Sequence, residues 1–230
     1  ITYSALTNQS DEQIAKNAWE GSRIGGNAGA NNATLFVTGT DPKQKKSSSK
    51  DLDPDFRHTI EKTFNEKLIE FEWTGGNTKE ARTEAAQKLY DIFQDYEFAP
   101  GEKFNLIAFS HGGNVLKEFT SLYSGDKKID NMILLGTPNR SDYNILLDFS
   151  DFGFYANKIS ISDIKDGVQT RGYIDGSVLR GAITIPENIR MMPGFVNVRA
   201  DQGLGPINNH GGLPTKKVWD ELVKKYLINN

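Results

Sequence analysis

Residues 104–113 read Phe-Asn-Leu-Ile-Ala-Phe-Ser-His-Gly-Gly, an apolar run that ends in a serine, a histidine and two glycines. An apolar run of this length predicts a buried strand, and the apolar stripe over residues 115–123 predicts a helix directly behind it. A serine at so sharp a junction projects its hydroxyl above the sheet, and small residues beside it keep the turn free of clashes. The stretch therefore predicts a strand, turn and helix unit that presents Ser110 as an attacking oxygen.

Segments typical of strands and helices alternate on both sides of this unit. Strands are expected at residues 34–38, 68–73, 129–135, 158–162 and 195–198. Helices are expected from Asp53-Pro54 to Phe64, from Asn77 to Tyr96 and from Val218 to Leu227. Strands that alternate with helices form a mostly parallel sheet with helices on both faces, so we expect a three-layer α/β fold.

Three local patterns refine this expectation. Asn77 and Glu80 resemble a capping box, so the long helix is expected to begin there. The polar run 43–50 (KQKKSSSK) has no apolar residue to bury and predicts a mobile, solvated loop. Residues 1–32 predict a leading helix followed by a loose connection rich in glycine and asparagine.

Length and composition narrow the classes of protein. The 230 residues fit one domain, 1–230, and 37% hydrophobic with 25% charged residues is ordinary for a globular protein. A net charge of -3 argues against nucleic acid as a partner. No apolar run approaches the roughly 18 residues that a membrane-spanning helix needs, so no integral membrane segment is expected. The absence of cysteine excludes disulfides, thiolate metal sites and a cysteine nucleophile.

The segment Ala108-Phe109-Ser110-His111-Gly112 resembles the nucleophile elbow of the α/β-hydrolase superfamily, which reads Gly-x-Ser-x-Gly. The resemblance extends over about residues 34–227 as an order of strands and helices, and it departs from the family at Ala108, where the family has glycine. It implies an α/β-hydrolase fold, catalytic residues in the order Ser, Asp, His along the chain, and acyl transfer without a cofactor. Ser110 is then the nucleophile.

The base that accepts the Ser110 proton is expected to be a histidine, because imidazole titrates near neutrality. His111 adjoins the nucleophile and is expected to point its ring elsewhere, while His58 is expected at a surface or half-buried position of a helix. His210 lies in a turn-rich loop, residues 208–212, before the final helix. The superfamily keeps its catalytic histidine in such a loop, so His210 is expected to be the general base.

The third member is an aspartate that orients the histidine. Asp163 and Asp166 both follow the strand expected at 158–162, and Asp201 follows the next strand. Residues 166–168 (Asp-Gly-Val) resemble the Asp-x-Val pattern that follows this strand in many lipase-like hydrolases. Asp166 is therefore preferred, with Asp163 and then Asp201 as the alternatives.

The resemblance also implies an oxyanion hole made of two backbone amides. One amide is that of His111, directly after the nucleophile. The other belongs to the loop after the strand at 34–38, where the family begins with His-Gly and this chain reads Thr38-Gly39-Thr40. Thr40 corresponds to the donor residue.

Other kinds of site find no pattern in the sequence. No phosphate-binding glycine motif follows a strand, and the glycines of residues 21–29 have the wrong spacing. No His-Glu-x-x-His pair is present either. We therefore expect no nucleotide, metal or other cofactor.

The substrate is suggested by residues 143–155 (YNILLDFSDFGFY), which are rich in apolar and aromatic side chains. They are expected to form either a lid or wall over an acyl chain or an ordinary core helix. A lid or wall over an acyl chain would favour a lipase, phospholipase or long-chain esterase acting on an ester or lipid. Two rivals are a binding module that keeps the fold without turnover and, since the chain begins with Ile1, the enzymatic part of a larger secreted or toxin-like protein.

Overall fold

The computed structural model describes residues 32–40, 46–98, 101–123, 129–138, 155–163, 165–171, 191–192, 194–204 and 206–228. The leading helix expected within 1–32 and nearly all of the apolar segment 143–155 lie outside the described residues. The elements are, in chain order, β1 (Ala33–Val37), β2 (Ser47–Ser48), the 3-10 helix η1 (Ser49–Asp51), α3 (Pro54–Phe64), β3 (Leu68–Ile69), β4 (Glu72–Trp73), α4 (Lys79–Asp95), β5 (Phe104–Phe109), α5 (Gly112–Leu122), β6 (Ile129–Leu135), β7 (Tyr155–Asp163), α6 (Gly167–Arg171), β8 (Val196–Ala200), α7 (Pro206–Gly211), α8 (Lys216–Val218), the π-helical segment η3 (Trp219–Val223) and α9 (Lys224–Ile228).

Six strands form one sheet in the order β3-β1-β5-β6-β7-β8, and every neighbouring pair is parallel. β2 and β4 pair with each other in a separate antiparallel ribbon. The direction of winding reverses at β1, because the chain passes outward to β3 before it crosses back to β5. Open parallel sheets bind ligands beside the carboxyl ends of the strands at such a reversal. The carboxyl ends of β1 and β5 are therefore the place to look for a site.

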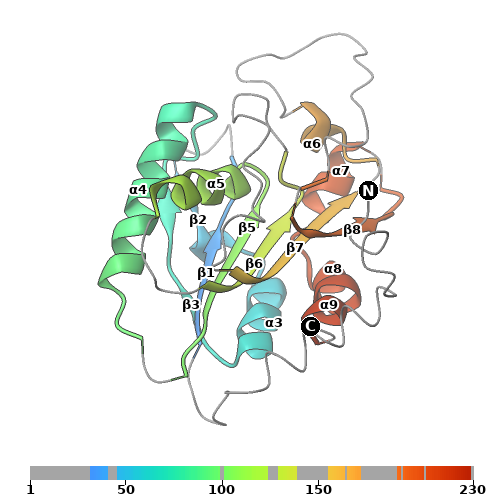
Figure 1. Cartoon of the computed structure of the whole chain (residues 1–230). Coiled ribbons are helices and arrows are strands. Elements are labelled where there is room, and N and C mark those ends of the chain that lie inside the picture. Colours follow the sequence, from blue (N-terminus) through green and yellow to red (C-terminus); the bar gives the residue numbers. More distant parts are fainter. Residues whose placement is uncertain are drawn as a thin grey trace.

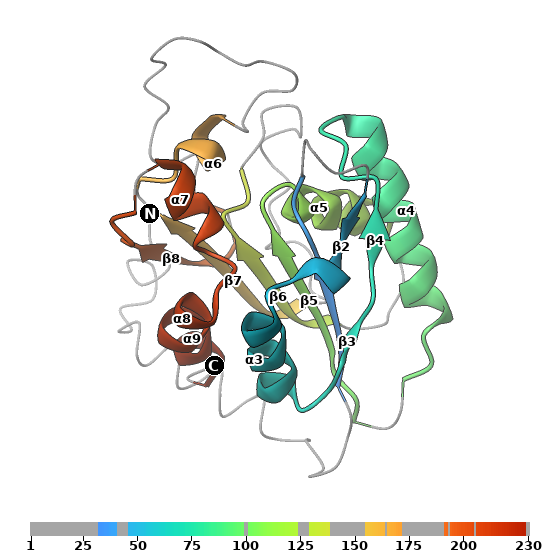
Figure 2. The ribbon, with the colours of Figure 1, turned by 180° about the vertical axis from the view of Figure 1, so that it is seen from behind.

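Helices cover both faces of this sheet. α4 and α5 lie on one face and α3, α8 and α9 on the other, as Figures 1 and 2 show from opposite sides. Alternate strand residues supply two cores: Leu35 and Val37 pack toward α4 and α5, whereas Phe36 packs toward α3 and Trp219. The mostly parallel, three-layer α/β fold expected from the sequence is confirmed.

A side chain caps the N-terminus of both α3 and α4, but only the cap of α3 is the residue expected from the sequence. Asp53 caps α3 as expected, since Phe56 N donates to its Oδ1 at 2.9 Å and Pro54 occupies the first helical position. α4 is capped by Thr78 and not by Asn77, because Ala81 N donates to the Thr78 hydroxyl at 3.2 Å. The capping box expected at Asn77 was wrong by one residue.

The expectation of a solvated loop over 43–50 was wrong for its second half. Serines 47–49 form β2 and the start of η1, and their side chains are buried. Phe71 N donates to Ser49 Oγ at 3.0 Å, and Ser49 N donates to Phe71 O at 3.0 Å. A polar run can be buried when its hydroxyls find partners in this way. The single strand expected over 68–73 is accordingly divided between β3 and β4.

A polar ladder crosses four strands at their amino ends. Asn105 Nδ2 donates to Thr34 Oγ1 at 3.0 Å, Asn131 Nδ2 donates to Asn105 Oδ1 at 2.6 Å, and Asn157 Nδ2 donates to Asn131 Oδ1 at 2.9 Å. These residues are also backbone partners in the parallel register. A strand shifted by one residue would break the ladder, so the ladder helps to fix the register of the sheet.

Replacement of the central rung is expected to destabilise the fold. Asn105→Leu leaves Thr34 Oγ1 without its donor and Asn131 Nδ2 without its acceptor in the core, and we expect the free energy of unfolding to fall by about 3 kcal/mol. The half-buried outer rung is the control: Asn157→Leu strands only one acceptor and should cost about 1 kcal/mol. Urea unfolding measures both, and equal costs for the two variants would contradict the ladder.

Glu66, between α3 and β3, carries a perturbed carboxyl group. Its burial, together with the nearby Glu102 carboxylate, raises the pKa of Glu66 from 4.5 to about 7. One of its oxygens is buried without a hydrogen-bond partner. Below pH 4.5 the group is protonated whether the chain is folded or unfolded, and above that pH the unfolded chain loses the proton first. Stability should therefore fall as the pH rises toward 7.

The size of this loss is limited by solvent screening of a partly exposed group. We expect the free energy of unfolding to fall by about 1 kcal/mol between pH 4.5 and 7 on account of Glu66. Glu66→Gln should remove this part of the pH dependence, measured by urea unfolding at several pH values. Glu84→Gln, at an exposed position of α4, is the matched control and should keep it. Identical pH profiles of wild type and Glu66→Gln would contradict the prediction.

Candidate active site

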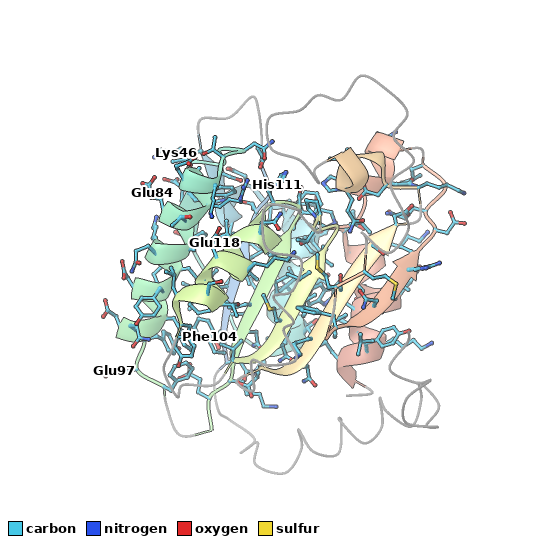
Figure 3. The ribbon with its side chains drawn as sticks, turned by 45° about the horizontal axis from the view of Figure 1, so that its top comes forward. Lys46, Glu84, Glu97, Phe104, His111 and Glu118 are labelled. Carbon is cyan, nitrogen blue, oxygen red and sulfur yellow. The ribbon has the colours of Figure 1, made fainter. Side chains whose placement is uncertain are left out.

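The residues singled out by the sequence meet at one edge of the sheet. Ser110 follows β5, Asp166 follows β7 and His210 lies on α7 after β8. The Thr38 to Thr40 turn follows β1 at the same edge. Figure 3 labels His111, which directly follows Ser110, at one end of the sheet, and Phe104 at the opposite end of β5. The carboxyl ends of the strands therefore bring together groups that are far apart in the chain.

Ser110 occupies a strained turn between β5 and α5. Its φ is 53°, and among the described non-glycine residues only Asn65 also has a positive φ. Ser110 N donates to Leu135 O at 2.9 Å, and Gly113 N donates to Ser110 O at 3.1 Å. Backbone in this region costs about 1 to 3 kcal/mol and persists where the surroundings fix it. The sharp turn expected from the sequence is present.

Three glycines allow the surrounding backbone to approach this turn. A Cβ on Gly112 would lie 2.3 Å from a carbonyl oxygen of β1, and a Cβ on Gly113 would lie 2.0 Å from the Thr137 hydroxyl oxygen. A Cβ on Gly39 would lie 2.7 Å from the Cβ of Ser110 and 3.3 Å from its Oγ. A side chain at any of the three would push the strand ends apart. Their smallness thus holds the β1 loop and the start of α5 around Ser110.

Ser110, His210 and Asp166 form a continuous hydrogen-bonded series. His210 Nε2 lies 2.9 Å from Ser110 Oγ, although the two residues are 100 positions apart, and His210 Nδ1 lies 2.6 Å from Asp166 Oδ2. In the neutral tautomer with the proton on Nδ1, that nitrogen donates to Asp166 and Nε2 accepts from the Ser110 hydroxyl. The three residues are nearly enclosed: Ser110 is 6%, His210 7% and Asp166 0% exposed.

The imidazole and the carboxylate are each held in place from other sides. The Phe109 ring packs against the His210 ring with centroids 4.8 Å apart, and a Cβ on Gly136 would come within 3.2 Å of it. Asp166 Oδ1 accepts from the backbone amides of Val168 at 2.9 Å and Gln169 at 2.8 Å. The first turn of α6 therefore orients the carboxylate so that its other oxygen faces His210.

The three candidate aspartates have three different surroundings. Of the three, only Asp166 lies within hydrogen-bonding distance of His210. Asp163 is buried and accepts from the side-chain amide of Asn209 at 2.7 Å. Asp201 is exposed and accepts from Lys165 Nζ at 3.1 Å. The geometry thus separates alternatives that the sequence left open.

His58 and His111 lie as expected from the sequence, whereas His210 lies on a helix and not in a loop. His58 is exposed on α3. The His111 ring is turned toward α5, where Asn114 Nδ2 lies 3.2 Å from its Nδ1. His210, expected in a loop, lies in the six-residue helix α7. The side chains of Asn208 and Asn209 donate hydrogen bonds that support this short helix, which the sequence did not indicate.

The turn after β1 is fixed by side chains that the sequence reading did not associate with the site. Ser47 Oγ donates to Gly39 O at 2.5 Å and lies 2.7 Å from Thr38 Oγ1. Trp73 Nε1 donates to Thr38 O at 3.1 Å. The Thr40 hydroxyl is buried without a partner. The β2 and β4 ribbon therefore holds the turn against Ser110, and the only sequence signal was the alternation that ends at Trp73.

The described residues show neither a metal site nor a membrane-spanning helix. They contain no group of three or more histidine, aspartate or glutamate side chains that could hold a metal ion. Within the same residues, no helix has both the length and the apolar character to cross a bilayer.

Comparisons with known proteins add no evidence on the chemistry of this chain. No known protein family matches the chain, and no curated protein matches it. A crystal structure of a putative YdeN-like hydrolase from Pectobacterium atrosepticum is similar to this chain, with 10% sequence identity and a TM-score of 0.41. The match covers 96% of this chain and 99% of the hydrolase chain. At this level of similarity nothing about the neighbour's chemistry carries over to this chain.

Proposed function

We propose that this chain is a serine hydrolase that cleaves carboxylic esters by acyl transfer. The observation that carries the proposal is the series Ser110, His210, Asp166, with contacts of 2.9 Å and 2.6 Å between nearly enclosed side chains. A hydroxyl is a weak nucleophile unless a base removes its proton, and a carboxylate on the far side of the imidazole stabilises the cation that results. The strained turn that displays Ser110 supports the same role.

Acylation begins when Ser110 Oγ attacks the ester carbonyl carbon and His210 Nε2 takes the hydroxyl proton. The carbonyl oxygen becomes an oxyanion, for which we propose the backbone amides of His111 and Thr40 as donors. His210 then gives its proton to the departing alkoxide. The alcohol leaves, and the acyl group remains bonded to Ser110.

Deacylation repeats these steps with water in place of the serine. His210 takes a proton from water, and the oxygen attacks the acyl carbonyl. The same two amides receive the second oxyanion. Collapse returns the proton to Ser110 Oγ and releases the carboxylic acid, so one ester and one water give one acid and one alcohol.

A lipase-like or phospholipase-like preference for acyl chains is the finer part of the proposal. It rests mainly on residues 143–155, which lie almost wholly outside the described residues. One apolar side chain beside the site agrees with it: the ring of Phe109 packs on the His210 ring with centroids 4.8 Å apart. An apolar side chain against the proposed base favours an apolar substrate group.

The experiment that tests the proposal is labelling with a fluorophosphonate, followed by peptide mapping, on the wild type and on His210→Ala. In parallel, p-nitrophenyl esters of increasing acyl length and a p-nitroanilide are offered as substrates. We expect the label on Ser110, ester hydrolysis that improves with acyl length, and loss of both in His210→Ala. His58→Ala, at an exposed histidine of α3, is the matched control and should behave as the wild type.

Two results would redirect the proposal. A folded wild type that neither labels nor hydrolyses any ester would favour a binding module that keeps the fold without turnover. Labelling at Ser110 with a preference for short, soluble esters would keep the serine hydrolase and remove the lipase-like part.

A further inference from the structure

Asp163, the aspartate outside the Ser110, His210, Asp166 series, is the last residue of β7 and is 0% exposed. Its two oxygens are both engaged. Oδ1 accepts from Lys165 N at 2.8 Å and from Asn209 Nδ2 at 2.7 Å, and Oδ2 accepts from Gln202 N at 3.0 Å. A buried carboxylate is retained only when its hydrogen bonds repay the loss of water.

The two donors to Oδ1 occupy equivalent places in the chain. Lys165 immediately precedes Asp166, and Asn209 immediately precedes His210. One oxygen of Asp163 therefore joins the backbone of the residue before the acid to the side chain of the residue before the base. Asp166 N also donates to Asp163 O at 3.1 Å, which adds a second link to the acid.

Asn209 needs this anchor because α7 is too short to be stable alone. A helix of six residues gains little from its own hydrogen bonds. Asn209 is 0% exposed, its Oδ1 accepts from Leu204 N at 2.7 Å, and its carbonyl accepts from Gln202 Nε2 at 2.8 Å. The buried Asn209 side chain thus links α7 to β7 and to the loop after β8 by hydrogen bonds.

We propose that Asp163 is a positioning residue that sets the spacing of Asp166 and His210 through Lys165 and Asn209. This inference rests on the proposed function for its effect on rate. It differs from a role as the acid, because Asp163 acts on the residues beside the pair. A shift of about 1 Å in a reacting group can cost about 100-fold in rate.

Two variants break the link at different points. Asp163→Asn presents an amide group to backbone and side-chain donors, and Asn209→Ala removes the connection to α7 while it leaves the Lys165 and Gln202 bonds in place. We expect each to lower kcat about 10- to 100-fold with KM changed by less than about 2-fold. The double variant should be no slower than the worse single variant, because both changes break one connection. If Asp163→Asn fails to fold, Asn209→Ala carries the test.

The matched control is Asp201→Asn. It removes the same charge from a nearby aspartate that is exposed and pairs with Lys165 Nζ. An exposed ion pair contributes little, so kcat should stay at the wild-type value. Any loss common to Asp201→Asn and Asp163→Asn would come from net charge and would not reflect positioning.

A spectroscopic readout separates positioning from simple destabilisation. The proton between His210 Nδ1 and Asp166 Oδ2, which are 2.6 Å apart, should give a far-downfield proton NMR signal. We expect that signal to shift or broaden in Asp163→Asn and Asn209→Ala and to persist in Asp201→Asn, all at temperatures where each variant is folded.

The outcomes distinguish the inference from the function beneath it. Wild-type kcat and an unchanged NMR signal in folded Asp163→Asn and Asn209→Ala would overturn the positioning role and leave the hydrolase intact. An inactive wild type would overturn the proposed function, and the NMR signal alone would then decide whether Asp163 places His210 against Asp166.

Discussion

Replacement of Ser110 by alanine is expected to abolish ester hydrolysis, with a loss of about 10⁴- to 10⁶-fold in kcat, while the protein remains folded. The His210 base lies 2.9 Å from the Ser110 hydroxyl oxygen, so the variant deprives the base of the group that it activates. The residual rate comes from binding and from the oxyanion donors. The measurement is kcat on the best p-nitrophenyl ester, with fluorophosphonate labelling as the second readout.

The stability of Ser110 variants checks the turn separately from the chemistry. Alanine keeps the strain of a side chain at φ 53°, whereas glycine relieves it. Ser110→Gly should therefore be as inactive as Ser110→Ala but more stable than it by about 1 kcal/mol. Substantial turnover by either variant would mean that another group attacks the ester. A less stable glycine variant would mean that the turn is not strained.

The fold was predictable because its signals are local. The apolar run of β5 and the glycines after Ser110 indicate a strand, a turn and a helix within 20 residues, and β6 was placed at the residues where it occurs. Hydrophobic runs of this kind are buried on both faces, so packing and pattern agree. The same logic identifies β1 and β7 to within a few residues.

The burial of serines 47–49 and the asparagine ladder were not predictable. Each asparagine of the ladder interrupts an apolar strand, and its partner lies on another strand at a register that only the folded sheet defines. Serines beside lysines resemble a solvated loop until Phe71 and Gly39 supply their hydrogen-bond partners. Satisfaction of buried polar groups is a property of tertiary structure, and the sequence gives little sign of it.

The sequence singled out Ser110 and His210 for the candidate site but left the choice of the acid open. Ser110 and His210 were selected by motif and by elimination among three histidines. Asp163 ends β7 and Asp166 lies three residues further on, so the choice between them depends on where α7 places the imidazole. That placement is decided by contacts between segments 44 or more positions apart, which no local pattern encodes.

The second large effect is expected for Asp166→Asn, which should lower kcat about 10⁴-fold with little change in stability. The amides of Val168 and Gln169 donate to Asp166 Oδ1, so the asparagine must keep its oxygen at that position. Its amide group then faces His210 Nδ1, where the aspartate oxygen lies at 2.6 Å. A donor at this place makes Nδ1 an acceptor and moves the ring proton to Nε2.

With the proton on Nε2, His210 can no longer accept the proton of the Ser110 hydroxyl, so the side chains are all present but the base is in the wrong tautomer. Comparison with Asp163→Asn, measured as kcat per folded molecule, separates this effect from displacement, which should cost only about 10- to 100-fold. Asp201→Asn, at the third aspartate, should be neutral. If Asp163→Asn proves the slower of the two, the acid has been assigned to the wrong residue, because loss of the tautomer must exceed the cost of a small shift in position.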